Sequence, residues 1–473
     1  MKIHFIGICG VAMSGLAIAL NKKGFIVSGS DKGFFPPIST HLNRAAISYY
    51  PGWHPDKMIQ NGVPDLVIVG NVASSQNPEW QFVLKNKIKY KSYPEAVAEY
   101  FVKKNSIVCA GTYGKTSSSA LLAWILRENN FAPGYMFGGL AINEIDSAEI
   151  SESDWSVLEG DEYKSARWDN EPKFSHYSPT HLLLTAVNWD HADVYPTEDS
   201  YFKAFADLVR KIPKNGLIVA CADNENSEKV IAKSDCKIVR YGKTQASDYS
   251  YANVRESKFG LEFDIIHSGD NYQIKSGMLG KYQAENITGV FAMANEIGIE
   301  AREIVQSIAT FKGMKRRLEK KFEGEITVLD DIAHSPLKAK SALQTVRKIY
   351  SGKIIAVFEP NAGNRQPESA PGYDHAFQAA DTVIIPRLTK IKIDEKADAR
   401  PIEGEELKNL ISKTHNGSIY IDNDDALINY IIQNAYARDA VIFLGSHGWR
   451  GMIEELVEKL SRLNPDRRIV SIK

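Results

Sequence analysis

One segment, residues 107–126, restricts the possible folds more than any other part of the chain. It reads IVCAGTYGKTSSSALLAWIL: a short apolar run, a turn with two glycines, a Lys-Thr pair and an amphipathic stretch. This order predicts a buried strand, a tight loop and a helix that begins at the lysine. Loop amides, a helix N-terminus and a lysine together bind nucleotide phosphates. The segment therefore predicts a phosphate-binding loop in an α/β sheet.

Each residue type in this loop has a chemical use. Gly111 and Gly114 allow the turn, Lys115 supplies a compact cation, and Thr116 supplies a hydroxyl for Mg²⁺. The full GxxxxGK[ST] pattern has a glycine where this chain has Cys109, so the loop is a shortened variant. The alternative is a glycine turn with a solvated lysine, but the flanking strand and helix favour phosphate binding.

Short apolar runs alternate with amphipathic stretches along the whole chain, which predicts doubly wound parallel sheets. The expected strands are residues 3–7, 25–28, 66–70, 107–110, 155–158, 182–187, 217–220, 326–329, 353–358, 382–385, 418–421 and 440–444. A hairpin is expected over 261–266 and 272–275, and helices over 13–21 and 284–297. At roughly 150 residues per domain the length suits three domains. We predict an N-terminal Rossmann-like domain over 1–104, a central P-loop ATPase-like domain over 105–318 and a C-terminal Rossmann-like domain over 319–473.

Composition excludes several classes of protein. The formal net charge of −1 gives no overall field to hold a nucleic acid or an anionic membrane, so neither is expected as a partner. The four cysteines contain no CxxC pair and are too few for a disulfide framework. We find no signal peptide and no apolar run long enough to span a membrane. A cytoplasmic enzyme is the expectation.

A second glycine loop lies near the N-terminus. Residues 7–15 read GICGVAMSG, and Asp31 follows at about the 20-residue spacing of a ribose-binding acid. Cys9 occupies the middle glycine of the GxGxxG fingerprint. The loop therefore predicts a diphosphate at a helix N-terminus without specifying a nicotinamide cofactor. A nicotinamide-dependent oxidoreductase remains an alternative, although it leaves the GTYGKT loop without a role.

Polar residues also follow several other expected strands, and the carboxyl ends of parallel strands are where ligands bind. Glu159 and His191 follow two strands of the central series, and with Thr116 they could form a site for a hard metal ion. In the third series Asp331 and His334 follow one strand, and residues 445–448 follow another. Taken singly, the acidic run 159–162 could equally be a solvated turn and His191 an ordinary loop residue.

Together these motifs resemble the Mur ligase family, the ADP-forming amide ligases of peptidoglycan synthesis, over essentially the whole chain. The matching motifs are GTxGKT at Gly111–Thr116, ExDE at Glu159–Glu162, DH at Asp190–His191, the end of GxHNxxN at Asn286, the RRLE arginine at Arg317, and DDxxHxP at Asp331, His334 and Pro336. Three positions depart from the usual pattern. Tyr113 replaces a histidine, Tyr282-Gln283 replaces His-Asn, and Ser335 replaces a common histidine.

The resemblance implies roles for residues in three groups. Catalytic roles fall on Lys115, Glu159, His191 and His334, with Thr116, Glu159 and His191 as ligands of Mg²⁺. ATP-binding roles fall on Gly111, Thr112, Gly114, Lys115, Thr116, Ser117, Asn286, Arg317 and Asp331. UDP-sugar-binding roles fall on Gly7, Cys9, Gly10, Met13, Ser14, Gly15, Ser30, Asp31 and Asn71.

Within the family, the GSD run at 29–31 is similar to the branches that take UDP-N-acetylmuramate itself. Residues 36–40, 69–71, 77–78, 161–163 and 358–360 are more similar to the branch that adds L-alanyl-γ-D-glutamyl-meso-diaminopimelate than to the branch that adds L-alanine. The implied reaction joins the sugar carboxylate to the peptide amine through an acyl phosphate, with ATP and Mg²⁺. The L-alanine ligase is the alternative, and a divergent nucleotide-binding protein without catalysis is a third. The sequence predicts no oligomeric state.

No motif identifies the residues that recognise the incoming amine. Candidates chosen only for their position after C-terminal strands are Asn361, Asn364, Arg365, His447 and Arg450.

Overall fold

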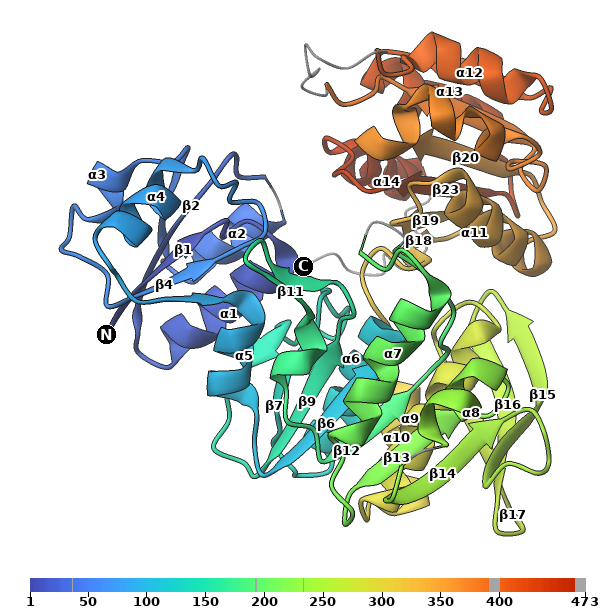
Figure 1. Cartoon of the computed structure of the whole chain (residues 1–473). Coiled ribbons are helices and arrows are strands. Elements are labelled where there is room, and N and C mark those ends of the chain that lie inside the picture. Colours follow the sequence, from blue (N-terminus) through green and yellow to red (C-terminus); the bar gives the residue numbers. More distant parts are fainter. Residues whose placement is uncertain (36, 192–193, 233, 391–399, 464–473) are drawn as a thin grey trace. The chain divides into compact units, whose positions relative to one another are not determined.

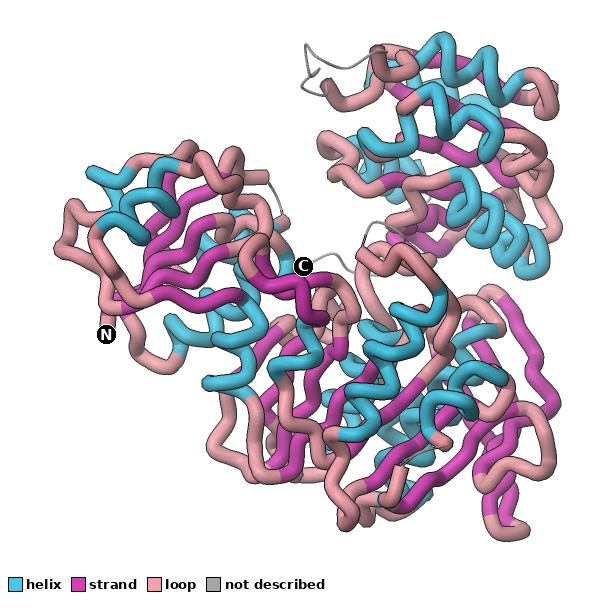
Figure 2. The backbone as a smooth tube through the Cα atoms, in the orientation of Figure 1, coloured by secondary structure: helices cyan, strands magenta, loops and turns pink. Residues whose placement is uncertain are grey.

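The computed structural model describes residues 1–35, 37–191, 194–232, 234–390 and 400–463. These residues form two compact units. The first contains Met1–Arg255, Leu261–Gly277 and Lys281–Gly313, and the second contains Glu256–Gly260, Met278–Gly280 and the chain from Met314 onward. Both consist of sheets with helices on their faces (Figures 1 and 2), so the predicted α/β class is confirmed.

The N-terminal sheet lies in the first unit and is parallel in the order β3-β2-β1-β4-β5. Its strands are β1 (Lys2–Ile6), β2 (Ile26–Asp31), β3 (Ser48–Pro51), β4 (Leu66–Val69) and β5 (Tyr90–Ser92). Its helices are α1 (Val11–Lys22), α2 (Ile38–Arg44), α3 (Pro55–Met58), α4 (Pro78–Lys85) and α5 (Tyr93–Phe101). The strand order reverses between β1 and β4, which is where such sheets bind ligands. The glycine loop 7–10 leaves the sheet at this point.

The central sheet, also in the first unit, has the order β17-β16-β15-β14-β13-β12-β6-β9-β7-β8. Its strands are β6 (Asn105–Ala110), β7 (Gly134–Met136), β8 (Ala148–Glu149), β9 (Trp155–Gly160), β12 (His181–Leu184), β13 (Leu217–Cys221), β14 (Lys237–Gly242), β15 (Tyr249–Ser257), β16 (Gly260–His267) and β17 (Asp270–Ser276). Its helices are α6 (Lys115–Glu128), α7 (Glu198–Arg210), α8 (Glu225–Ile231), α9 (Tyr282–Glu296) and α10 (Ala301–Thr310). Strands β9, β6, β12, β13 and β14 are parallel neighbours, so their following loops gather at one edge.

A small antiparallel hairpin joins the two parts of the first unit. It consists of β10 (Lys164–Ala166) and β11 (Asp169–Pro172), followed by the short helix η1 (Lys173–His176). The Trp168 ring stacks on Trp80 of α4 with centroids 4.8 Å apart, and the Asn71 amide donates to the carbonyl of Lys164 at 3.3 Å. The hairpin therefore connects the rim of the N-terminal sheet to the central sheet.

The second unit contains the sheet β18-β19-β23-β20-β21-β22, in which β18 is antiparallel to β19 and the remaining neighbours pair in parallel. Its strands are β18 (Glu319–Glu323), β19 (Thr327–Asp331), β20 (Ile354–Glu359), β21 (Thr382–Pro386), β22 (Ser418–Ile421) and β23 (Ala440–Gly445). Its helices are α11 (Pro336–Ile349), η2 (Ala362–Arg365), η3 (Pro367–Tyr373), α12 (Gly404–Ser412), α13 (Asp424–Asn434) and α14 (Met452–Leu463). Apolar clusters cover both faces of this sheet. None of the described helices is both long enough and apolar enough to cross a membrane.

One expected strand is shorter than its apolar run. The sequence predicts a strand over 182–187, but β12 ends at Leu184. The next residues bond to the phosphate-binding loop instead, since the amide of Thr112 donates to the carbonyl of Ala186 at 2.6 Å. The apolar run therefore continues past the strand because it supports a neighbouring loop.

Gly289 allows helix α9 to pack closely against Tyr241 of β14. A Cβ built at Gly289 would lie 2.6 Å from Cζ of Tyr241, whose ring is fully buried. We expect Gly289→Ala to lower the free energy of unfolding by about 1–2 kcal/mol, because overpacking costs up to ~3 kcal/mol and alanine returns only ~1 kcal/mol of helix propensity. Urea unfolding measures this change. Gly277→Ala, which meets nothing within 4 Å, is the control, and equal stability of the two variants would contradict the packing argument.

Candidate functional site

The loop 111–114 is shaped by two glycines with positive φ angles. Gly111 has φ 136° and Gly114 has φ 80°, a region that other residues rarely adopt. Space is also restricted: a Cβ at Gly111 would lie 2.0 Å from Oγ1 of Thr185, and one at Gly114 would lie 2.3 Å from Oδ1 of Asn286. Both predicted glycines are therefore required by conformation and by contact.

Residues after β12 hold the loop in place. The Thr185 hydroxyl donates to the carbonyl of Tyr113 at 2.6 Å. The Thr112 hydroxyl donates to the carbonyl of Asn188 at 2.8 Å and contacts the Tyr201 hydroxyl at 2.9 Å. The loop thus has a fixed shape before any nucleotide binds. Thr185 and Tyr201 carry no motif, so the sequence did not reveal them.

Lys115 folds back over this loop. Its Nζ donates to the carbonyl of Gly111 at 2.8 Å and lies 2.8 Å from Oε2 of Glu162. The Glu162 side chain is only 1% exposed, so a solvated acidic turn is the wrong interpretation for this residue. Removing a charge from water requires a partner, and Lys115 provides it. An anionic phosphate would compete with Glu162 for the same ammonium group.

The acidic run 159–162 serves three different contacts. Glu159 ends β9 and accepts a hydrogen bond from the Thr116 hydroxyl at 2.7 Å, and Asp161 pairs with Lys173. Burial opposes ionisation of Asp161, but the charge and hydrogen bond of Lys173 keep its pKa below the ordinary value. Glu162 contacts Lys115. The sequence singled out only Glu159, although the ExDE spacing carried the signal for the other two.

His191 lies beside Glu162 in a loop with a positive φ of 56°. Its Nε2 is 3.5 Å from Oε1 of Glu162, and its ring meets Tyr163 edge-on at 5.3 Å. The hydrogen bond with Glu162 raises the pKa of His191, assisted by the charge of Asp190. The structure therefore brings Thr116 to Glu159 and His191 to Glu162. Glu159, Glu162 and His191 do not form a group whose ligand atoms all lie within 4.8 Å of one another.

Helix α9 supplies the expected asparagine. Asn286 is 8% exposed and lies against Gly114, and its side-chain amide donates to Oε1 of Gln283 at 3.1 Å. Ser117, another predicted nucleotide contact, is buried in the first turn of α6. Tyr113 and Tyr282, two departures from the usual motifs, are both exposed at the loop and at the start of α9.

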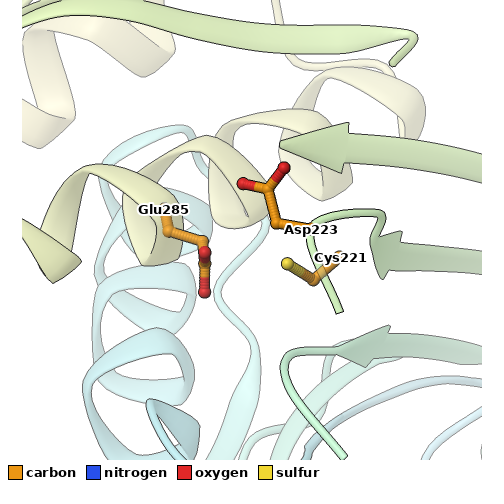
Figure 3. A group of neighbouring side chains, drawn as sticks. All are labelled: Cys221, Asp223 and Glu285. Atoms are coloured by element: carbon orange, nitrogen blue, oxygen red, sulfur yellow. The ribbon is translucent and has the colours of Figure 1, made fainter. Parts of the chain in front are cut away.

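The described residues that could hold a metal ion by proximity alone are Cys221, Asp223 and Glu285. Figure 3 shows their side chains together, between the end of β13 and the first turn of α9. Burial raises the pKa of the Cys221 thiol to about 12 and also raises the pKa of Glu285. The Cys221 thiol therefore stays protonated at neutral pH, and a protonated thiol is a poor metal ligand. We assign no metal to this cluster.

The glycine loop of the N-terminal sheet has its own polar support. Three consecutive amides are already bonded: Gly7 and Ile8 donate to the carbonyl of Ser30 at 2.9 and 3.1 Å, and Cys9 donates to the Asp31 carboxylate at 2.7 Å. Burial raises the pKa of Asp31. Gly10 begins α1 without a side-chain cap, so the amides of the first helical turn remain available to an anion.

The other residues predicted to bind the UDP-sugar occupy different surroundings. Met13 and Ser14 are buried in α1. A Cβ at Gly15 would lie 2.4 Å from Oγ of Ser147, so this glycine permits close packing against the central sheet. The Ser30 side chain is fully buried and donates to Glu79, while Asn71 bonds to the β10 hairpin. Pro36, part of the 36–40 motif, lies outside the described residues.

In the second unit the predicted residues follow β19. Asp331 accepts the amides of Leu318 and Ala333 at 2.8 and 2.9 Å, and burial raises its pKa. Nδ1 of His334 lies 2.7 Å from the carbonyl of Ile332, an acceptor, so Nδ1 carries the proton. Burial lowers the pKa of His334, which favours a neutral ring with Nε2 able to accept a proton. Arg317 follows Arg316, which donates to the carbonyls of Ser446 and His447 at 3.0 Å.

The residues expected to recognise the incoming amine differ in their exposure and in the hydrogen bonds that they already make. Arg365 is 3% exposed, and its guanidinium donates to Ile402, Thr389 and Glu403. It therefore holds loops together, and the expectation that it contacts a substrate is wrong. Arg450 is paired with Asp424 through two nitrogens and lies 3.5 Å from the buried Glu359. His447 is exposed.

Domain models of one family match almost the whole chain. The match is to the "Mur ligase family, catalytic domain" over residues 2–104, the "Mur ligase middle domain" over 109–294 and the "Mur ligase, glutamate ligase domain" over 316–447. The chain belongs to the Mur ligase family, whose members are ATP-dependent, ADP-forming ligases. This membership replaces the oxidoreductase alternative.

The chain is similar to two groups of ligases, which differ in the amine that their names give. The UDP-N-acetylmuramate–L-alanyl-γ-D-glutamyl-meso-2,6-diaminoheptandioate ligase of Escherichia coli is 29% identical, covering 98% of this chain and 99% of the relative. The corresponding ligase of Haemophilus influenzae is 28% identical over 97% of this chain and 99% of the relative. The UDP-N-acetylmuramate–L-alanine ligase of Agrobacterium fabrum is 28% identical over 94% and 93%.

Solved structures agree in fold. The murein peptide ligase of Psychrobacter arcticus is 25% identical with a TM-score of 0.71, covering 100% of both chains. The UDP-N-acetylmuramate–alanine ligase of Thermotoga maritima has a TM-score of 0.79 at 22% identity, covering 98% of this chain and 100% of that one. The predicted three-domain α/β fold is thereby confirmed.

The contact between His191 and Glu162 is testable by titration. Because the bond to Glu162 raises the pKa of His191, we expect Glu162→Gln to return it toward the ordinary value of about 6.5. The raised pKa means that this contact stabilises the fold below about pH 6.5 and stops doing so as the pH rises through the folded-state pKa. NMR titration of the histidine ring protons measures the pKa, with His191→Asn for assignment. An unchanged pKa in Glu162→Gln would show that Glu162 is not its cause.

Proposed function

We propose that this chain is the ATP-dependent ligase that joins the carboxylate of UDP-N-acetylmuramate to the amine of L-alanyl-γ-D-glutamyl-meso-diaminopimelate. One observation carries the proposal. A preformed loop with Lys115 and Thr116 lies at the sheet edge where Glu159, Glu162 and His191 also gather. Phosphoryl transfer to a carboxylate needs such a grouping of cation, hydroxyl and acids at one place. We also propose a cytoplasmic location and domain borders near residues 104 and 318.

The first step is activation of the sugar carboxylate. A carboxylate oxygen attacks the γ-phosphorus of ATP, the bond to the β-phosphate oxygen breaks, and ADP leaves while an acyl phosphate forms. Lys115, released from Glu162 by the incoming phosphate, stabilises charge on the transferred group. The amides of Gly114 and the first turn of α6 hold the phosphates. Asn286, Arg317 and Asp331 complete the proposed ATP contacts.

Two of the residues proposed to hold Mg²⁺, Thr116 and Glu159, offer the oxygen donors that this ion prefers. Thr116 and Glu159 offer a hydroxyl and a carboxylate oxygen that already lie 2.7 Å apart, and His191 adds a nitrogen near Glu162. When bound, Mg²⁺ neutralises the negative charge of the phosphates and of the carboxylate that must approach them. The carboxylate of Glu162 belongs to the same edge, and we add it to the proposed site.

The second step forms the amide. The peptide amine attacks the acyl carbon, and the tetrahedral intermediate releases phosphate as the carbon–oxygen bond breaks. A neutral histidine with an open Nε2 can take the proton that the amine loses. His334 has that tautomer, so we propose it as the base. The UDP end of the sugar is assigned to the first helical turn of α1.

L-Alanine is the second candidate for the amine. Alanine ligases are nearly as similar to the chain as the tripeptide ligases, at 27–28% identity. The sequence motifs at 69–71, 77–78 and 358–360 favour the tripeptide. Relatives of both kinds act on UDP-N-acetylmuramate by their names, so the proposals share that substrate.

Phosphate release measures the choice of amine. We expect turnover with ATP, Mg²⁺, UDP-N-acetylmuramate and the tripeptide, and little turnover when L-alanine replaces the tripeptide. Omitting UDP-N-acetylmuramate is the control for simple ATP hydrolysis. Turnover with L-alanine alone would reassign the chain to the alanine reaction, and no release with either amine would favour the non-catalytic alternative.

Lys115→Ala tests the site. Loss of one preorganised charge stabiliser typically costs ~10²–10³ in kcat, and we expect a loss of that size. Lys275→Ala is the matched control, because the Lys275 side chain is 73% exposed in β17. Equal rates for Lys115→Ala and the parent protein would refute the assignment of this loop.

A further inference from the structure

A fully buried carboxylate lies beneath the first glycine loop. Glu79 is 0% exposed and stands in the first turn of α4. Its backbone is fixed by the helix cap, since the amides of Glu79 and Trp80 both donate to Oδ1 of Asn77 at 3.0 Å. No step proposed above uses it. A carboxylate buried to this degree is costly unless it is paired and bonded, so its surroundings indicate its purpose.

Four groups surround the carboxylate. Oε1 accepts the Tyr50 hydroxyl at 2.6 Å and the His54 amide at 2.8 Å. Oε2 accepts the Ser30 hydroxyl at 2.5 Å and lies 3.8 Å from Nε2 of His4. Burial would raise the pKa of Glu79, but the nearby His4 ring and the hydrogen bonds from Ser30 and Tyr50 keep it below the ordinary value. The carboxylate is therefore ionised at neutral pH.

One of these contacts leads directly to the glycine loop. The Ser30 hydroxyl binds Glu79, and the Ser30 carbonyl accepts the amides of Gly7 and Ile8. The adjoining Asp31 accepts the amide of Cys9. Three successive loop amides are therefore hydrogen-bonded to the end of β2. These bonds set the direction in which the loop enters α1. Only the later amides, from Gly10 onward, remain for a bound anion.

We propose that Glu79 is a positioning residue for the nucleotide-sugar site. Its carboxylate, acting through Ser30, fixes the end of β2 and so aims the first turn of α1 at the diphosphate. This inference rests on the proposed function, since it concerns binding of the UDP-sugar. Replacing the Glu79 carboxylate leaves the residues of the glycine loop and of α1 unchanged. It alters only the hydrogen bond to Ser30 that holds the end of β2. Binding of the UDP-sugar should therefore weaken more than the chemical step.

The test compares Glu79→Gln and Ser30→Ala with the parent protein. For each variant we expect the KM and the directly titrated Kd for UDP-N-acetylmuramate to rise about tenfold, the lower range for loss of a hydrogen bond to a charged group. For Glu79→Gln, the KM for ATP and the kcat at saturating sugar should stay within about twofold, because the partners of Glu79 all lie in the N-terminal part of the first unit. Thermal unfolding and circular dichroism establish that each variant is folded.

A matched control separates positioning from general stability. Tyr249→Phe removes a buried hydroxyl that donates to Asn295 at 2.8 Å in the central part of the first unit. It should lower the Tm without changing the KM for the sugar. If Glu79→Gln and Ser30→Ala lower the Tm but leave the KM and Kd for the sugar at parent values, their role is structural and the proposal is overturned.

The parent protein is titrated first, so that two failures are distinguished. A parent protein that does not bind UDP-N-acetylmuramate overturns the proposed function and this inference together. A parent protein that binds it, with Glu79→Gln and Ser30→Ala binding equally well, overturns only the role of Glu79. A rise in KM confined to Glu79→Gln, with Ser30→Ala unchanged, overturns the route through Ser30.

Discussion

Hydrogen bonds between the 111–114 loop and the residues after β12 are the constraint on which the candidate site depends. The Thr112 amide donates a hydrogen bond to the carbonyl of Ala186, and the Thr185 hydroxyl donates one to the carbonyl of Tyr113. These bonds hold the positive-φ turn that starts α6 at Lys115. With that helix fixed, Lys115 and Thr116 face the acids at the end of β9, and Asn286 closes against Gly114. The charges of the site therefore meet because neutral backbone groups have first set the loop.

The two glycine loops solve the same problem differently. In the central sheet, the hydroxyls of Thr185, which follows β12, and of Tyr201 in α7 support the loop, and the buried Glu162 binds its lysine. In the N-terminal sheet, the loop amides donate hydrogen bonds to the end of β2, and the buried Glu79 accepts a hydrogen bond from Ser30 at that end. Both arrangements leave a helix N-terminus open toward solvent, which is what an anionic ligand requires. The cost of burying each carboxylate is offset by several donors, as a preorganised site demands.

Much of this was readable in the sequence. The apolar periodicity located β1, β4, β6, β9, β13 and the strands β19 to β23 of the second unit to within a few residues, because strands buried on both faces leave continuous apolar runs. Short edge elements such as β3, β8 and the β10–β11 hairpin escaped, since partly exposed strands of two to four residues carry little pattern. The spacing of Gly111, Gly114 and Lys115 identified the loop because turn, cation and helix start are local. Their position after two parallel strands placed Glu159 and His191 at the same edge.

The sequence by itself determined the α/β class, the order of strands and helices, and the loop at 111–116, all of which depend on neighbours in the chain. Only the tertiary structure decided how the charges pair: Glu162 with Lys115 and His191, Asp161 with Lys173, and Glu159 with Thr116. It also showed that Arg365 bonds loops together, that Gly15 permits close packing, and that Glu79 bonds to Ser30 below the first loop. Adjacent acids look alike in a sequence. Their roles separate because the chain leaves β9 after Gly160, so the later acids meet different neighbours, and burial of a charge requires a partner.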